Sequence, residues 1–387
     1  MLIVGAVLAV ATVTVLCAEV WARRWIRSEG KYFVWRPHHK KVIELNPVYS
    51  PFLRKPIHIS INAEGERGGE LPKTAGKLYR VLVAGDSTAE CITLDQDETW
   101  PAVLERILET NKSQIGVDAV HVGNIAKTLV AEGSGLRIIL EKILPRYLDL
   151  DLIILTTGIS TVYRWFEEGC PSGLPAPPTP VGQLFSQYPE MEFGRRPENT
   201  ALAELAQRWL FRFTGYAGRN LGAGRVKIAI ASQRSGVQEF YPLIENPAGM
   251  LDTFEQELRG VVALAKTKAP RIILVYPFWF QKDHFTAAEE AALWLGYVGK
   301  PNLKKKQWQF VSQKDLFKLY GRVEKRAAKV AQEMAVEAID LKDFLDPRLG
   351  IYYDDCHLTP AGAALAAQKI AALVLRGQQP HNPNATQ

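Results

Sequence analysis

The pattern of apolar and polar residues predicts five short buried strands that alternate with amphipathic helices. The apolar runs that predict strands cover residues 79–84, 118–123, 151–158, 271–277 and 337–341. Apolar residues at helical spacing predict helices near 100–108, 136–144 and 252–267, over about 314–335, and from Thr359–Pro360 onwards. This alternation predicts an α/β fold, with a parallel sheet between two layers of helices.

The alternating pattern is interrupted between about residues 163 and 250, which we interpret as an insertion. Five prolines lie within residues 171–180, and neither a helix nor a sheet interior accommodates them. Within the insertion, we expect a helix near 200–212 and a strand at 225–232. The predicted organisation is an anchor at 1–22, a lead-in segment at 23–77, a main domain at 78–377 and a flexible tail at 378–387. The lead-in segment is too rich in proline and basic residues to predict a core.

The N-terminal segment resembles a single transmembrane helix. It has no charged residue before Glu19, and about 20 apolar residues are enough to cross a bilayer. A cleaved signal peptide fits less well, because no basic residue precedes the apolar run. Arg23, Arg24 and Arg27 favour a cytoplasmic location for the rest of the chain. An extracytoplasmic location fits the expected function better, so the side of the membrane stays open.

Charge and cysteine content narrow the possible functions. The formal net charge is +6 over 387 residues, and the basic residues are scattered apart from the run at 304–306. We therefore expect no nucleic-acid partner. The four cysteines do not form a CxxC motif, and no metal or cofactor is predicted.

Two short motifs suggest nucleophilic catalysis. The stretch "VLVAGDST" places Ser87 at the end of a predicted strand, where it is either a helix cap or a nucleophile. Asp86 fits a support of this turn better than a catalyst. The stretch "YYDDCHLTP" follows the last strand and contains Asp354 and His357. Ser87 as nucleophile, His357 as base and Asp354 as the acid that orients the base would complete a catalytic triad.

The order of the motifs resembles the SGNH (GDSL-type) hydrolases, whose four sequence blocks carry Ser, Gly, Asn and His. "GDST" matches the first block, "HVGNIAKT" and "LIILTTGIST" stand where the second and third belong, and "DDCHLTPAGAALAA" matches the fourth. The stretches "INAEGERGGE" and "DETWPAVLERIL" resemble a membrane-anchored bacterial subgroup. The resemblance implies an αβα three-layer sandwich with a five-stranded parallel sheet and hydrolysis of an ester or thioester.

The chain departs from the family pattern at three positions. Ser160 replaces the Asn of the third block, His121 stands where an Asn often opens the second block, and Ala126 replaces that block's second Gly. The resemblance then implies an oxyanion hole made by the backbone N–H groups of Ser87 and Ala126, with Ser160 as a third candidate donor. His121 fits a structural histidine better than a substrate contact.

The sequence favours a serine esterase that removes an acyl group, O-acetyl included, from a carbohydrate or lipid through an acyl-enzyme. Two alternatives remain open: an acyltransferase that acts on a glycan, and a catalytically weak module that binds glycan. The partners are then an ester-bearing carbohydrate or lipid and, through residues 1–22, a membrane. Cys91 and Cys356 either form a disulfide between the two catalytic loops or remain buried thiols.

Overall fold

The main domain is built on a parallel sheet of five strands. The computed structural model describes residues 2–45, 51–53, 56–73, 76–170, 179–214, 217–223, 225–234, 237, 240, 247–300 and 308–377. The strand order is β10-β7-β5-β3-β4. These strands are β3 (Leu78–Ala84), β4 (Ala119–Asn124), β5 (Leu152–Thr156), β7 (Arg271–Val275) and β10 (Glu337–Ile339). All five predicted strands are therefore confirmed, and they lie in one sheet.

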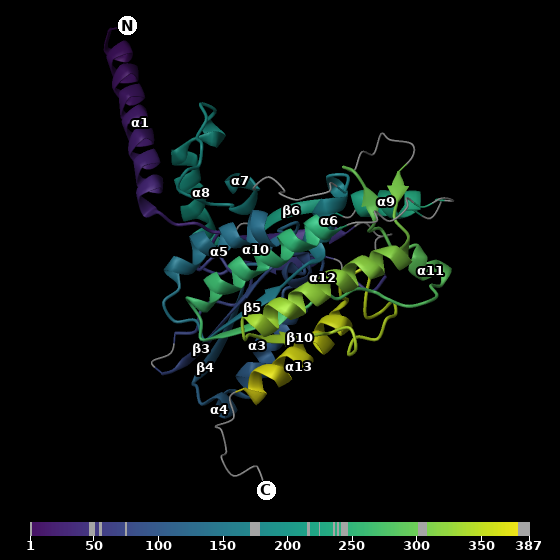
Figure 1. Cartoon of the computed structure of the whole chain (residues 1–387). Helices are drawn as coiled ribbons and strands as arrows, with labels where there is room; N and C mark the ends of the chain where they lie inside the picture. The colour runs from purple at the N-terminus through teal and green to yellow at the C-terminus, as the bar shows by residue number, and fades with distance from the viewer. Residues whose placement is uncertain are drawn as a thin grey trace.

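Helices cover both faces of this sheet (Figure 1). One face carries α3 (Trp100–Thr110) and α13 (Pro360–Arg376), and the other carries α5 (Arg137–Ile143), α10 (Ala248–Lys266) and α12 (Gln313–Glu333). Strand β3 shows why two layers form, because its side chains alternate between the faces. Val81 and Val83 belong to the core with α3 and α13, whereas Leu82 and Ala84 belong to the other core. The predicted αβα three-layer sandwich is confirmed.

Shorter elements connect these layers. The helices are α2 (Ser87–Glu90), α4 (Lys112–Ile115), α6 (Ile159–Glu167), α7 (Val181–Leu184), α8 (Ala201–Thr214), α9 (Arg225–Arg234) and α11 (Ala287–Glu290). Three further single turns are η1 (Glu132–Leu136), η2 (Leu144–Arg146) and η3 (Pro197–Asn199), and a small hairpin pairs β8 (Tyr297–Val298) with β9 (Gln309–Phe310). The helix expected near 200–212 is confirmed as α8. The strand expected at 225–232 is wrong, because these residues belong to α9.

A second sheet joins the lead-in segment to the insertion. Strand β1 (Lys40–Leu45) pairs antiparallel with β2 (Ile57–Ser60) and parallel with β6 (Ala217–Ala223). The lead-in segment also contributes to the core, since Ile57 is fully buried and packs in the cluster that includes α3 and α13. The expectation that this segment lacks core residues is wrong, because strand pairing aligns its few apolar positions on one face. The proline-rich stretch 171–178 and the tail from 378 lie outside the described residues.

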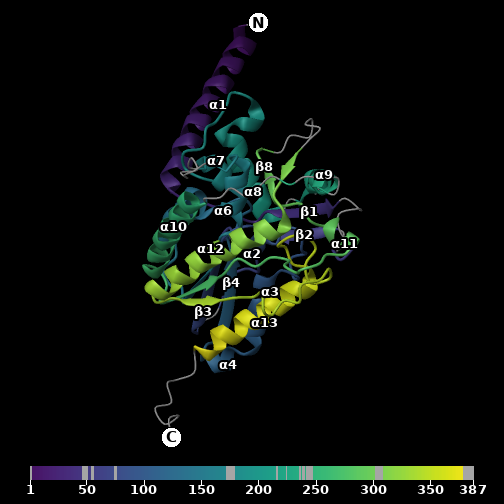
Figure 2. The same ribbon diagram turned by 45° about the vertical axis from the view of Figure 1, so that its right-hand side comes forward.

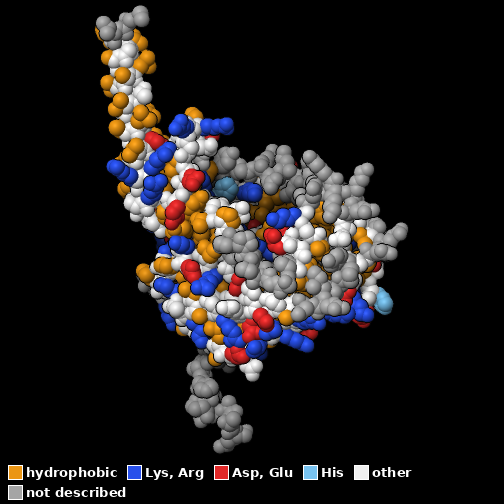
Figure 3. Space-filling view, turned by 45° about the horizontal axis from the view of Figure 1, so that its top comes forward, with side chains coloured by type: hydrophobic (Ala, Val, Ile, Leu, Met, Phe, Trp, Pro, Cys, Tyr) orange, Lys and Arg blue, Asp and Glu red, His pale blue; other side chains and the backbone are white. Residues whose placement is uncertain are grey.

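Helix α1 (Leu2–Glu29) extends away from the rest of the protein (Figure 2). Hydrophobic side chains cover much of its protruding part, and charged side chains gather where it meets the main body (Figure 3). Residues Ile3–Glu29 are long and apolar enough to cross a membrane, with a mean hydropathy of 2.3 in their most apolar window. The N-terminal helix is thus a candidate membrane anchor or signal sequence.

The C-terminal third of α1 packs against α8. The Glu19 carboxylate accepts hydrogen bonds from the backbone N–H groups of Ala201 and Leu202, at 2.9 and 3.0 Å. These two N–H groups begin α8 and have no acceptor within that helix. At the C-terminal end of α1, the Glu29 carboxylate forms an ion pair with the Arg208 guanidinium at 2.6 Å. Helix α8 is therefore fixed against the base of the apolar helix.

Candidate active site

The turn after β3 places Ser87 at the carboxyl end of the sheet. Gly85 has φ +146°, and a Cβ atom there would lie 2.0 Å from Thr156 Oγ1 on the neighbouring strand β5. Only glycine fits this close approach. Asp86 then caps the short helix α2 that begins with Ser87, because its Oδ1 accepts from the N–H and the hydroxyl of Thr88, at 3.0 and 2.7 Å. The contacts of Asp86 agree with the predicted supporting role.

The structure brings Ser87, His357 and Asp354 into a continuous chain of hydrogen bonds. His357 Nε2 lies 2.8 Å from Ser87 Oγ, and His357 Nδ1 lies 2.8 and 2.9 Å from the two carboxylate oxygens of Asp354. Ser87 is half-buried, whereas Asp354 and His357 are buried. This geometry matches the arrangement in which a base takes the serine proton while an acid fixes the tautomer of the base.

Several donors hold Asp354 in place. Its Oδ1 accepts from the backbone N–H groups of Cys356 and His357, at 3.1 and 2.9 Å. Its Oδ2 accepts from the indole N–H of Trp294 at 3.0 Å. The neighbouring Asp355 accepts from the backbone N–H groups of Trp294 and Leu295, at 2.7 and 3.0 Å. The paired aspartates therefore have separate tasks, since Asp354 orients His357 and Asp355 holds the segment that carries Trp294.

Sequence reasoning missed both Trp294 and the task of Asp355. The adjacent aspartates in "YYDDCH" were the available signal, because two neighbouring carboxylates seldom serve the same partner. The segment that contains Trp294 follows a charged stretch and has no recognisable motif.

The backbone N–H groups of Ala126 and Ser160 both have acceptors within the structure, whereas the candidate oxyanion donor of Ser160 is its hydroxyl. The Ala126 N–H donates to Asn124 Oδ1 at 2.9 Å, and the Ser160 N–H donates to Asp86 Oδ2 at 3.1 Å. Ser160 is buried, and its backbone thereby ties the third block to the turn that carries Ser87. The assignment of Ser87, Ala126 and Ser160 to an oxyanion hole stays a prediction.

Two buried glutamates support the loops around Ser87, and sequence reasoning missed both. Glu90 ends α2 and accepts from the N–H and the hydroxyl of Thr128, and burial raises its pKa. Glu132 accepts from the Gly158 N–H at 2.6 Å and from the Thr161 hydroxyl. Burial raises the pKa of Glu132 to about 7 despite these hydrogen bonds. Glu90 therefore connects α2 to the second sequence block, through Thr128. Glu132 connects η1 to the third block, through Gly158 and Thr161.

His121 belongs to a buried polar network beside the sheet. Its Nε2 lies 2.8 Å from Glu66 Oε2, and Tyr147 OH donates to Glu66 Oε1 at 2.6 Å. Burial alone raises the pKa of Glu66, but the hydrogen bond and charge of His121 and the other donors lower it to about 2. Both His121 and Glu66 are only 1% exposed. These contacts agree with the predicted structural role of His121.

All four cysteines are free thiols in this structure. Cys91 and Cys356 are both buried and are not joined to each other. The structure therefore has the predicted buried thiols and not the alternative disulfide. Burial raises the pKa of Cys91 to about 12, which makes its thiolate inaccessible at neutral pH.

Among the described residues, Asp354, Cys356 and His357 form a group whose possible metal-ligand atoms lie within 4.8 Å of one another. Asp354 and His357 already bind each other, and His357 binds Ser87 through its second nitrogen. A metal at this position would therefore break the hydrogen-bond chain.

The chain is similar to several solved structures, although no family model or curated sequence matches it. An acetylxylan esterase, Axe2, from Geobacillus stearothermophilus is 14% identical, with a TM-score of 0.40 over 77% of this chain and 94% of that one. A GDSL-like lipase described from Parabacteroides merdae is 13% identical, with a TM-score of 0.40 over 78% and 96% of the two chains. A carbohydrate acetylesterase family member from Sinorhizobium meliloti is 11% identical, with a TM-score of 0.40 over 78% and 99%.

Proposed function

We propose that this chain is a membrane-anchored serine esterase of the SGNH type, which removes an acyl group from a carbohydrate or lipid through an acyl-enzyme. The observation that carries the proposal is the hydrogen-bond chain from Ser87 through His357 to Asp354. The four SGNH-like motifs and the five-stranded parallel sheet support it. The esterases and lipases among the structural neighbours are consistent with this class of reaction.

The first half of the proposed reaction forms the acyl-enzyme. Ser87 Oγ attacks the ester carbonyl carbon while His357 Nε2 takes the hydroxyl proton. The backbone N–H of Ser87 is the first donor to the resulting oxyanion, and Ala126 and Ser160 are the further candidate donors. The tetrahedral intermediate collapses, the C–O bond to the alcohol breaks, and His357 returns the proton to the leaving alcohol.

The second half releases the acid. Water attacks the acyl-enzyme, His357 accepts a proton from this water, and Ser87 recovers its proton as the acyl–Oγ bond breaks. Asp354 stays ionised throughout and stabilises the imidazolium form of His357. If a sugar hydroxyl replaces water in this step, the same residues transfer the acyl group to a glycan. The triad geometry fits both outcomes, so acyl transfer remains the second candidate function.

Labelling by a fluorophosphonate probe tests the nucleophile directly. The full chain in detergent should be labelled, and Ser87→Ala should abolish the labelling together with hydrolysis of p-nitrophenyl acetate. His357→Ala should also abolish hydrolysis, because no base then activates Ser87. Retention of full hydrolysis by Ser87→Ala would refute the proposal. Absence of labelling in the folded wild-type chain would favour the glycan-binding module instead.

A further inference from the structure

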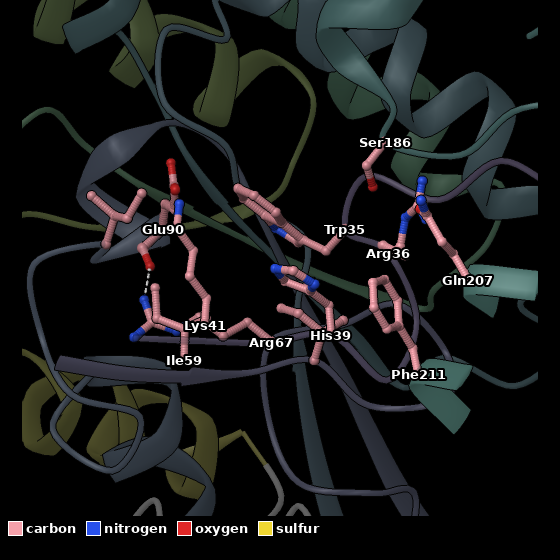
Figure 4. Close-up of a pocket in the computed structure, with 12 residues that line it drawn as sticks. Trp35, Arg36, His39, Lys41, Ile59, Arg67, Glu90, Ser186, Gln207 and Phe211 are labelled. Carbon is pink, nitrogen blue, oxygen red and sulfur yellow. Dashed lines mark hydrogen bonds between the residues drawn. The ribbon is translucent and has the colours of Figure 1, made fainter. Parts of the chain in front are cut away.

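A pocket of about 310 Å³ lies between the lead-in segment and α8 (Figure 4). Its volume is at the lower end of the range of small-molecule sites, about 300–1,000 Å³. Apolar side chains form most of its wall, namely those of Trp35, Ile59, Ile61, Ile92 and Phe211. The described residues that line it include none of Ser87, Asp354 and His357. The pocket is therefore a cavity separate from the triad.

One polar atom in the pocket wall lacks a hydrogen-bond partner. His39 Nδ1 is buried, and no donor or acceptor among the described residues reaches it. The His39 ring packs edge-on against Phe211, with 5.7 Å between the two ring centroids (Figure 4). A buried polar atom without a partner is costly, so such an atom in a pocket wall indicates a polar ligand. A pure hydrocarbon would leave His39 Nδ1 unsatisfied.

The pocket wall also carries an excess of positive charge. Lys41 lies on β1, and its ammonium group forms no hydrogen bond or ion pair with any described residue. Arg67 is 4% exposed, and its guanidinium donates to neutral acceptors, among them the carbonyls of Glu90 and Cys91 at 2.5 and 2.8 Å. The Glu90 carboxylate binds Thr128 instead, and burial raises its pKa. An anionic ligand would therefore supply the charge that Lys41 and Arg67 lack among the described residues.

The same positive charge acts on His39. Burial lowers the pKa of His39, and the nearby charges of Arg36 and Lys41 lower it further. His39 is therefore neutral at pH 7, and a neutral imidazole can donate through Nδ1 to a carboxylate oxygen. Arg36 is itself paired with Glu204 at 2.8 Å, so Lys41 is the cation beside His39 that an anion would meet. A hydrogen-bonding atom and an unpaired cation in one wall together favour a carboxylate ligand.

We propose that this pocket is a binding site, separate from the triad, for a small carboxylate with an apolar body of one or two rings. The carboxylate binds Lys41 Nζ and His39 Nδ1, and the rings pack against the apolar wall. An engineered cavity of about 150 Å³ holds one benzene molecule, so a pocket of about 310 Å³ has room for two fused rings. Binding at this site does not require the esterase activity proposed above.

Isothermal titration calorimetry of the full chain in detergent tests this site with probes of similar size but different charge. The probes are 2-naphthoate, 2-naphthylmethanol and 2-naphthylmethylammonium. We expect 2-naphthoate to bind at least about tenfold more tightly than the alcohol, because hydrogen bonds to a charged group contribute more than neutral ones. The ammonium probe should not bind, because it would lie beside the charge of Lys41. Acetate should bind more weakly than 2-naphthoate, because it buries almost no apolar surface.

Substitutions in the wall show whether 2-naphthoate binds in this pocket. Lys41→Met should weaken its binding about tenfold and change the binding of 2-naphthylmethanol little. His39→Phe should also weaken it, because phenylalanine keeps an aromatic ring against Phe211 but has no Nδ1. Lys40→Met is the matched control, since Lys40 precedes Lys41 on β1, is exposed and does not line the pocket. Ser87→Ala should bind 2-naphthoate as the wild type does, because Ser87 does not line the pocket either.

Three results would overturn the site. The first is no saturable binding of 2-naphthoate by the folded chain, which would show that water alone satisfies His39 Nδ1. The second is equal affinity for 2-naphthoate and 2-naphthylmethanol, since the wall would then not select an anion. The third is an affinity for 2-naphthoate that is the same in Lys41→Met as in wild type, which would place the probe elsewhere. If His39→Phe does not fold, Lys41→Met alone still decides, and none of these results depends on ester hydrolysis.

Discussion

The indole N–H of Trp294 donates a hydrogen bond to Asp354 Oδ2 at 3.0 Å, 60 residues away in sequence. This contact connects the segment after α11 to the acid of the triad. Asp355 fixes the same segment from its backbone side. The orientation of His357 therefore depends on a tryptophan that lies outside every recognised sequence block.

Trp294→Phe should lower kcat about tenfold, because a hydrogen bond to an ionised group contributes about 1.5–3 kcal/mol. The aromatic ring is kept, so the fold should survive. Trp279→Phe is the matched control, since Trp279 is also buried and its indole donates to Gln281 at 2.9 Å instead of to Asp354. Steady-state kinetics of both variants decide the question. Equal losses in the two variants would show that Trp294 acts only through packing.

Asp354→Asn should reduce kcat less than Ser87→Ala or His357→Ala, because catalysis often survives in part when the orienting acid is lost. An asparagine still fits the space between His357 and Trp294. It cannot, however, stabilise the imidazolium charge. Single-turnover measurements with p-nitrophenyl acetate would compare the three variants. An Asp354→Asn enzyme as inactive as Ser87→Ala would contradict this order.

The sequence was sufficient to predict the five strands and the two helix layers, because both depend on local pattern. The contact of Ser87 with His357 and Asp354 was also expected. Buried parallel strands are continuous apolar runs, and the Thr359–Pro360 start of α13 has the expected cap, with the Thr359 hydroxyl accepting from Gly362 N–H. The Ser87 and His357 motifs lie at the ends of such elements, so their meeting followed from the topology.

Pairings between segments far apart in the sequence could not be predicted from local pattern. Strand β1 pairs with β6 across the sequence, and nothing in either segment specifies its partner. Residues 225–232 have a β-branched and apolar composition that favours a strand, yet they belong to a helix. Glu90 and Glu132 were missed for a similar reason, since a carboxylate in a sequence shows no sign of being buried until its partners, Thr128 and Thr161, are in place.

Ser160→Asn should raise turnover about tenfold, if the asparagine amide supplies the third oxyanion donor that the SGNH pattern has at this position. Ser160→Ala should change turnover little, because a serine hydroxyl reaches less far than an amide. Both variants keep the backbone N–H that donates to Asp86, so the turn should be preserved. The measurement is kcat for a simple aryl ester. A large loss in Ser160→Ala with no gain in Ser160→Asn would show that the serine hydroxyl already serves as a donor.

Glu66→Gln should destabilise the protein by about 3–5 kcal/mol at neutral pH. The substitution removes the carboxylate charge around which the buried partners of Glu66 are arranged. Glu66 has a folded pKa of about 2, below its ordinary value of 4.5. Its stabilisation is therefore complete above about pH 5 and is lost as the pH falls towards 2. Urea unfolding at neutral pH measures the cost. Glu141→Gln is the control, since Glu141 is exposed and forms only a surface pair with Arg137. Equal small losses in both variants would contradict the structural role of the Glu66–His121 pair.

Glu132 should give the opposite pH dependence. Its folded pKa of about 7 lies above the ordinary 4.5, so between these values the folded state keeps a proton that the unfolded state has lost. Stability should therefore fall as the pH rises from 4.5 to 7, by about 3 kcal/mol in total. Glu132→Gln cannot titrate and can still accept from the Gly158 N–H.

The free energy of unfolding of Glu132→Gln relative to wild type should consequently shift in favour of the variant by about 3 kcal/mol between about pH 4 and pH 8. Comparing the two pH values cancels any constant cost of the substitution. Glu141→Gln provides the reference, because Glu141 is exposed and its replacement should leave the pH dependence of stability unchanged. A difference for Glu132→Gln that is equally constant over this range would show that Glu132 carries the same charge in the folded and unfolded states, and that its burial beside the third block has no energetic consequence.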